Sequence, residues 1–285
     1  MGLRSIVIVT LLFAFCSSVS AQSISVRPQN TIQQGEVFQA RVSDLPKGVW
    51  VTSVDFDGNK TPFYTRFGIT RAVRGLPLSA KAGERPITVI LNTKQKLLAT
   101  VTVIPREKPV RALPSIPKSL GGNTVASENT LAKTLGEENK IIASPWSNPK
   151  ALWYEPFRYP VKNPIVTDVF GYSRQGSSVT VNHKGTDYRA EIGTPVFAMN
   201  RGVVRISRNF RNYGNTVVVD HGVGVLTYYM HLKERHVQVG KLVARGERIG
   251  LSGDTGYVSA PHLHITVRVN GASIDPEQFL QVMGE

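Results

Sequence analysis

The sequence predicts an all-β protein with two β domains joined by a linker. Short runs of β-branched and aromatic residues, separated by turn signals such as Asp-Gly, recur in both halves of the chain. Apolar residues at helical spacing occur in one stretch of the linker only. With 285 residues, 41% of them hydrophobic and 19% charged, the chain is long enough for about two ordinary globular domains.

Residues 1–21 have the pattern of a signal peptide. Arg4 precedes an apolar run at 6–15, and Val19-Ser20-Ala21 is the expected cleavage site. The run is shorter than the roughly 20 residues that a membrane helix needs. We therefore expect a secreted or cell-envelope protein, in the periplasm or cell wall, with no integral membrane segment after signal removal. The one cysteine, Cys16, lies in this leader, so the mature chain would have no disulfide and no thiolate metal ligand.

The chain is strongly basic, with 34 Lys and Arg against 20 Asp and Glu and a formal net charge of +14. This charge favours an anionic partner, such as nucleic acid, a phospholipid surface or a wall polymer. Export disfavours a role in gene regulation, and the sequence contains no recognisable nucleic-acid-binding module. We expect an anionic cell-wall surface as partner and no nucleic acid.

Residues 22–105 predict a small β-sandwich domain. Strands are expected at 37–42, 50–56, 87–91 and 98–103, and Asp57-Gly58 after the second of them predicts a hairpin. This part of the chain contains no histidine. A spacer, wall-contact or inhibitory module is therefore expected here rather than a catalytic one.

Residues 106–150 predict a linker. Prolines and the pair Gly121-Gly122 mark its first half, and Leu131, Leu135 and Ile142 at roughly helical spacing predict one short helix within 128–142. The segment would either dock across the following domain or serve as a tether. Its Pro and Gly content favours the tether.

Residues 151–285 predict a second domain, an antiparallel β-sheet with strands at 167–172, 179–181, 203–206, 216–219 and 225–230. All six histidines lie in this domain, which makes it the candidate for chemistry. They are His183, His221, His231, His236, His262 and His264.

His262 and His264 flank Leu263 at the start of a β-branched run. In a strand the two imidazoles share one face while Leu263 turns into the core. With His183 and Asp187 added, the chain offers imidazoles and a carboxylate that could hold one divalent ion and leave a position open, as in catalytic zinc sites. Gly185, between His183 and Asp187, favours a turn instead of the helical His-Glu-x-x-His arrangement.

Several motifs, taken in order, resemble the lysostaphin-type (LytM) zinc metallopeptidases. They are His183-Lys184-Gly185-Thr186-Asp187, Gly193-Thr194-Pro195-Val196, Tyr213-Gly214-Asn215, Asp220-His221-Gly222, Tyr229-Met230-His231-Leu232 and Gly253-Asp254-Thr255-Gly256 through Pro261-His262-Leu263-His264. The resemblance covers about residues 160–281. It implies a LytM-like fold for this domain and one zinc ion per chain, held by His183, Asp187 and His264. It also implies that His231 and His262 are the catalytic pair that flanks the attacked carbonyl, and it leaves open which of them is the base.

The other polar residues have weaker interpretations. We expect a structural hydrogen-bonding role for His221 and a solvated position for His236. Tyr213, Arg174 and Asn182 either line the groove or serve in packing and at the surface, so they are left out of the predicted site.

The resemblance and the expected export predict a secreted zinc metalloendopeptidase that hydrolyses peptide bonds in bacterial cell-wall peptidoglycan, in stem peptides or cross-links, through a metal-activated water. The alternative is a non-catalytic wall-binding or amidase-activating protein whose site is occluded by the N-terminal domain or the linker. A non-haem iron oxygenase fits the ligand types. The four-residue spacing of His183 and Asp187 argues against it, because those sites usually place the two ligands two residues apart.

Overall fold

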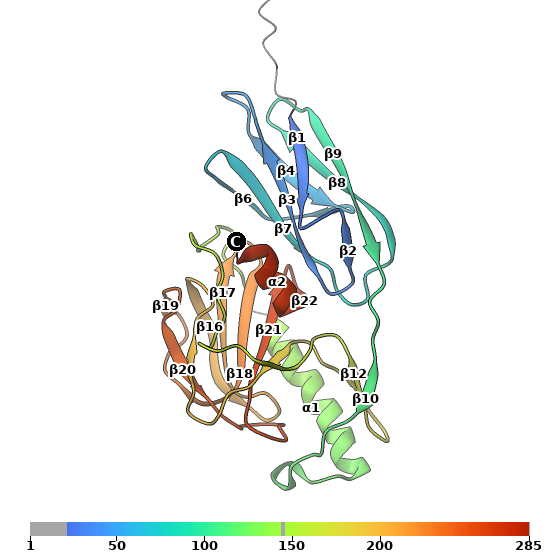
Figure 1. The fold of residues 1–285 in the computed structure, drawn as a ribbon, viewed down its shortest axis with the longest axis vertical. Helices are drawn as coiled ribbons and strands as arrows, with labels where there is room; N and C mark the ends of the chain where they lie inside the picture. The colour runs from blue at the N-terminus through green and yellow to red at the C-terminus, as the bar shows by residue number, and fades with distance from the viewer. Residues whose placement is uncertain (1–21, 144–145, 285) are drawn as a thin grey trace, which may run out of the picture.

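The structure is a computed structural model that describes residues 22–143 and 146–284. The expected signal peptide lies outside the described residues. Two α-helices and many strands make up this part of the chain, which confirms the all-β fold class. In Figure 1 the N-terminal domain lies above the C-terminal one. None of the helices described is both long and apolar enough to cross a bilayer.

The N-terminal domain is a sandwich of two sheets around one core, as the sequence predicts. One sheet has the order β1 (Ser23–Arg27), β3 (Val37–Ser43), β7 (Ile69–Gly75) and β6 (Phe63–Arg66). The other has the order β2 (Thr31–Gln33), β9 (Lys96–Ile104), β8 (Gly83–Leu91), β4 (Val51–Phe56) and β5 (Asn59–Lys60). The predicted hairpin joins β4 to β5, with Asp57 and Gly58 at φ 52° and 79°, the positive values that a two-residue turn requires.

The C-terminal domain is built on a mainly antiparallel ten-stranded sheet. Its main order is β11 (Val166–Asp168), β14 (Thr186–Tyr188), β21 (Leu263–Val269), β18 (Val225–Arg235), β17 (Gly214–Gly222), β16 (Gly202–Phe210) and β19 (Leu242–Val243). Strands β15 (Pro195–Phe197), β20 (Arg248–Ser252) and β22 (Ala272–Ile274) pair beside this path. Along β21, Leu263, Ile265 and Val267 are fully buried in the main core. The residues between them are therefore left for the opposite face.

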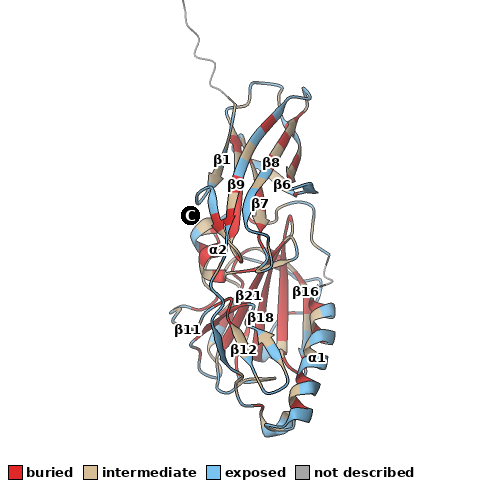
Figure 2. Ribbon diagram, turned by 90° about the vertical axis from the view of Figure 1, so that its right-hand side faces the viewer, coloured by how far each residue is buried: buried red, intermediate tan, exposed pale blue. Residues whose placement is uncertain are grey.

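The linker is docked on the C-terminal domain and is not a free tether, so that interpretation of the sequence is wrong. Its strand β10 (Val110–Ala112) pairs with β12 (Ser173–Gln175), which pairs with β13 (Thr180–Asn182). A 3-10 turn η1 (Lys118–Leu120) leads into helix α1 (Val125–Ala143), which is 19 residues long. Figure 2 shows α1 running along the C-terminal domain with exposed residues on its outer side.

Helix α1 is anchored at both ends. Thr124 accepts a hydrogen bond from Ser127 N at 3.1 Å and so caps its start. Near its end, Ile142 is buried in a cluster that includes Phe210 and Tyr228. The buried apolar cluster and the strand pairing of β10 together explain why a Pro-rich segment is ordered here.

The second helix, α2 (Pro276–Met283), joins the two domains. Asp275 caps it by accepting from Glu277 N at 3.0 Å. The buried Gln278 side chain accepts from Val37 N at 2.9 Å and donates to Val37 O at 2.8 Å, so it continues the edge of β3. Arg106 adds an ion pair to Asp275 at 3.0 Å. The sandwich is thus fastened to the C-terminal end of the second domain.

Candidate metal and catalytic site

The three residues predicted as metal ligands converge in one buried cluster. Ligand atoms of His183, Asp187 and His264 all lie within 4.8 Å of one another. Asp187 Oδ1 is 2.6 Å from His264 Nδ1 and 3.2 Å from His183 Nε2. Strand pairing produces this geometry, because Asp187 on β14 lies directly opposite His264 on β21.

Gly185 is needed for this packing. A Cβ at position 185 would lie 2.5 Å from His264 Nε2 and 2.3 Å from Ile265 O. Both distances are shorter than a carbon contact permits. Only glycine therefore lets the turn from His183 to Asp187 pass so close to β21.

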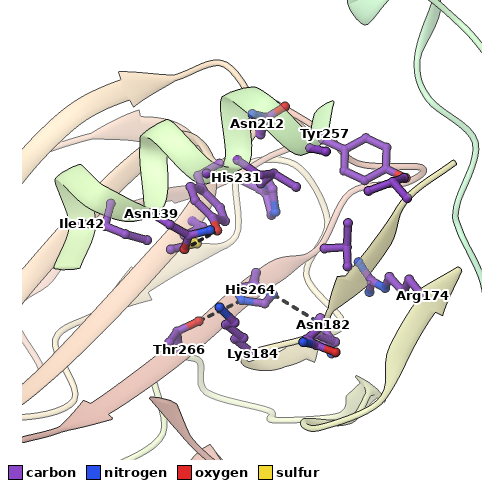
Figure 3. A pocket seen from close by; sticks show the side chains of 18 of the residues that line it. Asn139, Ile142, Arg174, Asn182, Lys184, Asn212, His231, Tyr257, His264 and Thr266 are labelled. Atoms are coloured by element: carbon purple, nitrogen blue, oxygen red, sulfur yellow. Dashed lines mark hydrogen bonds between the residues drawn. The ribbon is translucent and has the colours of Figure 1, made fainter. Parts of the chain in front are cut away.

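Further hydrogen bonds orient the two imidazoles. His183 Nδ1 donates to Val169 O at 2.6 Å, so the lone pair of its Nε2 can coordinate a metal ion. His264 Nε2 is bonded to Thr266 Oγ1 at 3.0 Å, and this bond is drawn as a dashed line in Figure 3. The Nδ1 atom of His264 is thereby left facing Asp187.

Electrostatics favour the protonation states that a metal needs. Burial opposes ionisation of Asp187, but the charge and hydrogen bonds of His264 and His183 hold its pKa well below the usual range. Burial lowers the pKa of His264 despite the opposing effect of Asp187. An ionised carboxylate and imidazole nitrogen atoms, all buried, fit a divalent ion that accepts N and O ligands.

His231 and His262, the predicted catalytic pair, lie beside this cluster. Their ring centroids are 5.0 Å apart, and His262 Nε2 is 3.7 Å from Asp187 Oδ1. His231 Nδ1 donates to Thr255 O and His262 Nδ1 donates to Ala260 O, each at 2.8 Å. These bonds leave both Nε2 atoms available to a substrate.

The backbone of His231 is unusual. Its φ is +59°, in the left-handed region that side chains other than glycine rarely adopt, and β18 contains a register shift here. Such strain is common at functional positions, where the surrounding structure holds it. Burial, reinforced by His262 and His264, lowers the pKa of His231 to about 3, so its imidazole is neutral near pH 7.

Two cavities reach the site. One, of about 290 Å³, lies between the cluster and helix α1 and is lined by His183, His231 and His264 (Figure 3). The other, of about 300 Å³, is lined by Asp187, His262 and the loop 257–261. A peptide chain could approach the cluster through either cavity.

Several residues outside the predicted site line the first cavity. Arg174, Asn182 and Tyr213, for which the sequence leaves a groove position open, do line it. Lys184 and Arg268 line it too and were missed, although the alternation His264, Thr266, Arg268 along one strand was a readable signal. The helix residues of this cavity are Ala132, Leu135, Gly136, Asn139 and Ile142.

The two remaining histidines lie outside the cluster. His221 is fully buried, with its Nδ1 bonded to Arg201 O and its Nε2 to Thr227 Oγ1. Its hydrogen-bonding role is as predicted. His236 is exposed and lies 3.1 Å from Glu234, in agreement with the solvated position expected.

The region that contains the cluster is similar to known peptidases. Residues 181–276 match the model of peptidase family M23. Peptidoglycan DD-endopeptidase ShyA of Vibrio cholerae is 47% identical over 93 residues, which are 33% of this chain and 22% of that protein. DD-carboxypeptidase/endopeptidase Mpg of Neisseria meningitidis is 43% identical over 94 residues, again 33% of this chain and 22% of the relative. The similarity therefore spans only about a fifth of these relatives.

One solved structure resembles the larger part of the chain. It is a crystal structure of a candidate peptidase M23 from Pseudomonas aeruginosa, with a TM-score of 0.53 at 24% identity. The match covers 85% of this chain and 95% of that one. At this identity the similarity shows a shared fold.

Proposed function

Residues 181–276 form a domain of peptidase family M23, and from this membership we propose that the chain is a secreted zinc metalloendopeptidase acting on bacterial peptidoglycan. The observation that carries the proposal is the buried convergence of His183, Asp187 and His264. His231 and His262 beside them supply the groups for proton transfer.

The substrate is inferred from the relatives and from charge. Relatives at 47% and 43% identity are named as peptidoglycan DD-endopeptidase and DD-carboxypeptidase/endopeptidase. A net charge of +14 would draw the chain to an anionic wall. We infer that it cleaves peptide cross-links or stem peptides in the cell envelope.

The roles of the residues follow from their atoms. His183 Nε2, His264 Nδ1 and an Asp187 oxygen would hold the ion. A bound zinc ion would supply Lewis acidity that activates water and polarises a carbonyl. His231, whose imidazole is neutral, has its Nε2 placed to accept a proton. His262 would donate a hydrogen bond from Nε2 to the developing oxyanion in its protonated form, since its Nδ1 proton is already given to Ala260 O.

The test is hydrolysis of purified sacculi by the zinc-loaded protein, read as new amino termini and as fragments in mass spectrometry. His264→Ala and Asp187→Ala should each lose the bound zinc and abolish release, because each removes one of three ligands. His236→Ala, at an exposed histidine outside the cluster, is the matched control and should retain both. Release that survives both ligand changes would refute the metal assignment.

Helix α1 favours a second candidate, a wall-binding or amidase-activating protein with a covered site. Five residues of this helix line the cavity beside the cluster. The same experiment separates the two candidates. A zinc-loaded protein that binds sacculi but releases no amino termini would be the binding protein.

A further inference from the structure

Three cationic side chains line the cavity under helix α1. Its lining residues in the described part of the chain include Lys184, Arg174 and Arg268 but no Asp or Glu. Positive charge beside a partly desolvated cavity is unfavourable unless an anion pairs with it.

The three cations differ in how they are paired. Arg174 Nη2 lies 3.0 Å from Asp168 Oδ2 and 3.5 Å from Asp187 Oδ2, so its charge is already balanced. Lys184 Nζ meets no acceptor within residues 22–143 and 146–284. Lys184 and Arg268 therefore carry the two positive charges that an anionic ligand could balance.

Arg268 is held in place yet keeps donors free. The residue is only 8% exposed, its Nε donates to Ser273 Oγ at 3.3 Å, and its Nη1 donates to Ile142 O at 3.2 Å. These two bonds use two of the five N–H groups of the guanidinium, and the Tyr228 side chain also contacts it. A fixed guanidinium with spare N–H groups is well suited to bind a carboxylate.

Both cations are anchored close to the metal cluster. Lys184 follows His183 directly, and Figure 3 shows its side chain beside His264. His264, Thr266 and Arg268 line the same cavity from alternate positions of β21. At about 3.3 Å per residue along the strand, the Arg268 backbone lies roughly 13 Å from that of His264. The long Arg268 side chain can bring its guanidinium closer to the metal cluster than that. Such a distance corresponds to a few residues of an extended peptide.

We propose that Lys184 and Arg268 form a subsite for a substrate carboxylate, so that the protein prefers peptides with a free carboxylate within about two residues of the scissile bond. The inference rests on the proposed endopeptidase function and names its substrate class. Lys184 is the more accessible member, and Arg268 is the buried one.

The test compares two synthetic peptides that differ only in a carboxylate and the matching carboxamide next to the scissile bond. Binding to the metal-free protein is measured by fluorescence anisotropy, and cleavage by the zinc-loaded protein is measured separately. The carboxylate peptide should bind about tenfold more tightly, as expected for one charge-assisted hydrogen bond. In cleavage the preference should appear mainly in KM.

Variants of Lys184 show whether this residue carries the preference. Lys184→Met should reduce the ratio of the affinities for the carboxylate and carboxamide peptides to near one. Lys184→Arg should retain most of the preference for the carboxylate. Lys162→Met removes an exposed lysine outside the cavity lining and should leave it unchanged.

Equal binding of both peptides by the wild type, or a preference that survives Lys184→Met, would overturn the subsite. If neither peptide nor sacculi were cleaved, the endopeptidase proposal would fail. The binding comparison would still decide whether the subsite exists.

Discussion

His221 and His231 are both buried histidines of the same sheet, and their hydrogen bonds give them different roles. Both ring nitrogen atoms of His221 are bonded within the protein, at 2.9 Å to Arg201 O and 2.8 Å to Thr227 Oγ1. His231 is bonded through Nδ1, at 2.8 Å to Thr255 O, and within the described residues its Nε2 has no hydrogen-bond partner. A histidine with both nitrogen atoms satisfied is a structural group, whereas one with a free nitrogen beside a cavity can take part in chemistry.

Burial of His221 should make stability depend on pH. Desolvation lowers its pKa to about 4, against 6.5 when unfolded. As the pH falls below 6.5, the unfolded chain binds a proton that the folded chain excludes, so folding is weakened. Between pH 7 and pH 5 this group should cost about 2 kcal/mol. In urea unfolding with a chelator present, His221→Gln should lose about that much less stability than the wild type over this interval. Parallel pH profiles for the two proteins would contradict the assignment.

Directional polar contacts add to the apolar packing that holds helix α1 on the C-terminal domain. The buried Glu138 carboxylate accepts from Asn212 N at 3.0 Å and Tyr213 N at 3.4 Å. Asn139 Oδ1 accepts from the Tyr213 hydroxyl at 3.1 Å. The same helix lines the cavity, so these contacts fix one wall of it.

Glu138→Ala should loosen the helix. The change leaves two backbone N–H groups without their acceptor, which costs about 1–3 kcal/mol. Hydrogen exchange across residues 131–142 should quicken, and the neighbouring exposed Glu137→Ala should not have this effect. Unchanged exchange in Glu138→Ala would mean that the apolar contact of Ile142 alone holds the helix.

At the scale of the whole molecule, the two domains are coupled through α2. Gln278 bonds both backbone groups of Val37, and Arg106 pairs with Asp275. Close packing adds to this, since a Cβ on Gly75 would lie 2.8 Å from Val269 O. We expect the domains to unfold together.

Gln278→Ala should weaken this coupling, because it leaves the buried N–H and C=O of Val37 unpaired, at a cost of about 2 kcal/mol. Calorimetry should show the single transition broadening or separating into two. Gln281→Ala, at an exposed position of the same helix, should leave the transition unchanged. An unaltered single transition in Gln278→Ala would show that packing alone couples the domains.

Local patterns in the sequence determined the fold class, the Asp57-Gly58 hairpin and the shared face of His262 and His264. Each depends on residues a few positions apart, where strand alternation and turn chemistry act. The predicted ligand set also lies together, although its chemical roles stay predictions. Only the tertiary structure decided that the linker docks, that helix α1 covers the cavity and that Lys184 and Arg268 face one space. These features join residues far apart in the chain, such as Val110 with Ser173 and Glu138 with Asn212, which is 74 positions away. The contact between the domains joins Val37 with Gln278, 241 positions away. Periodicity carries no information about such distant pairings, because they form only when separate elements pack.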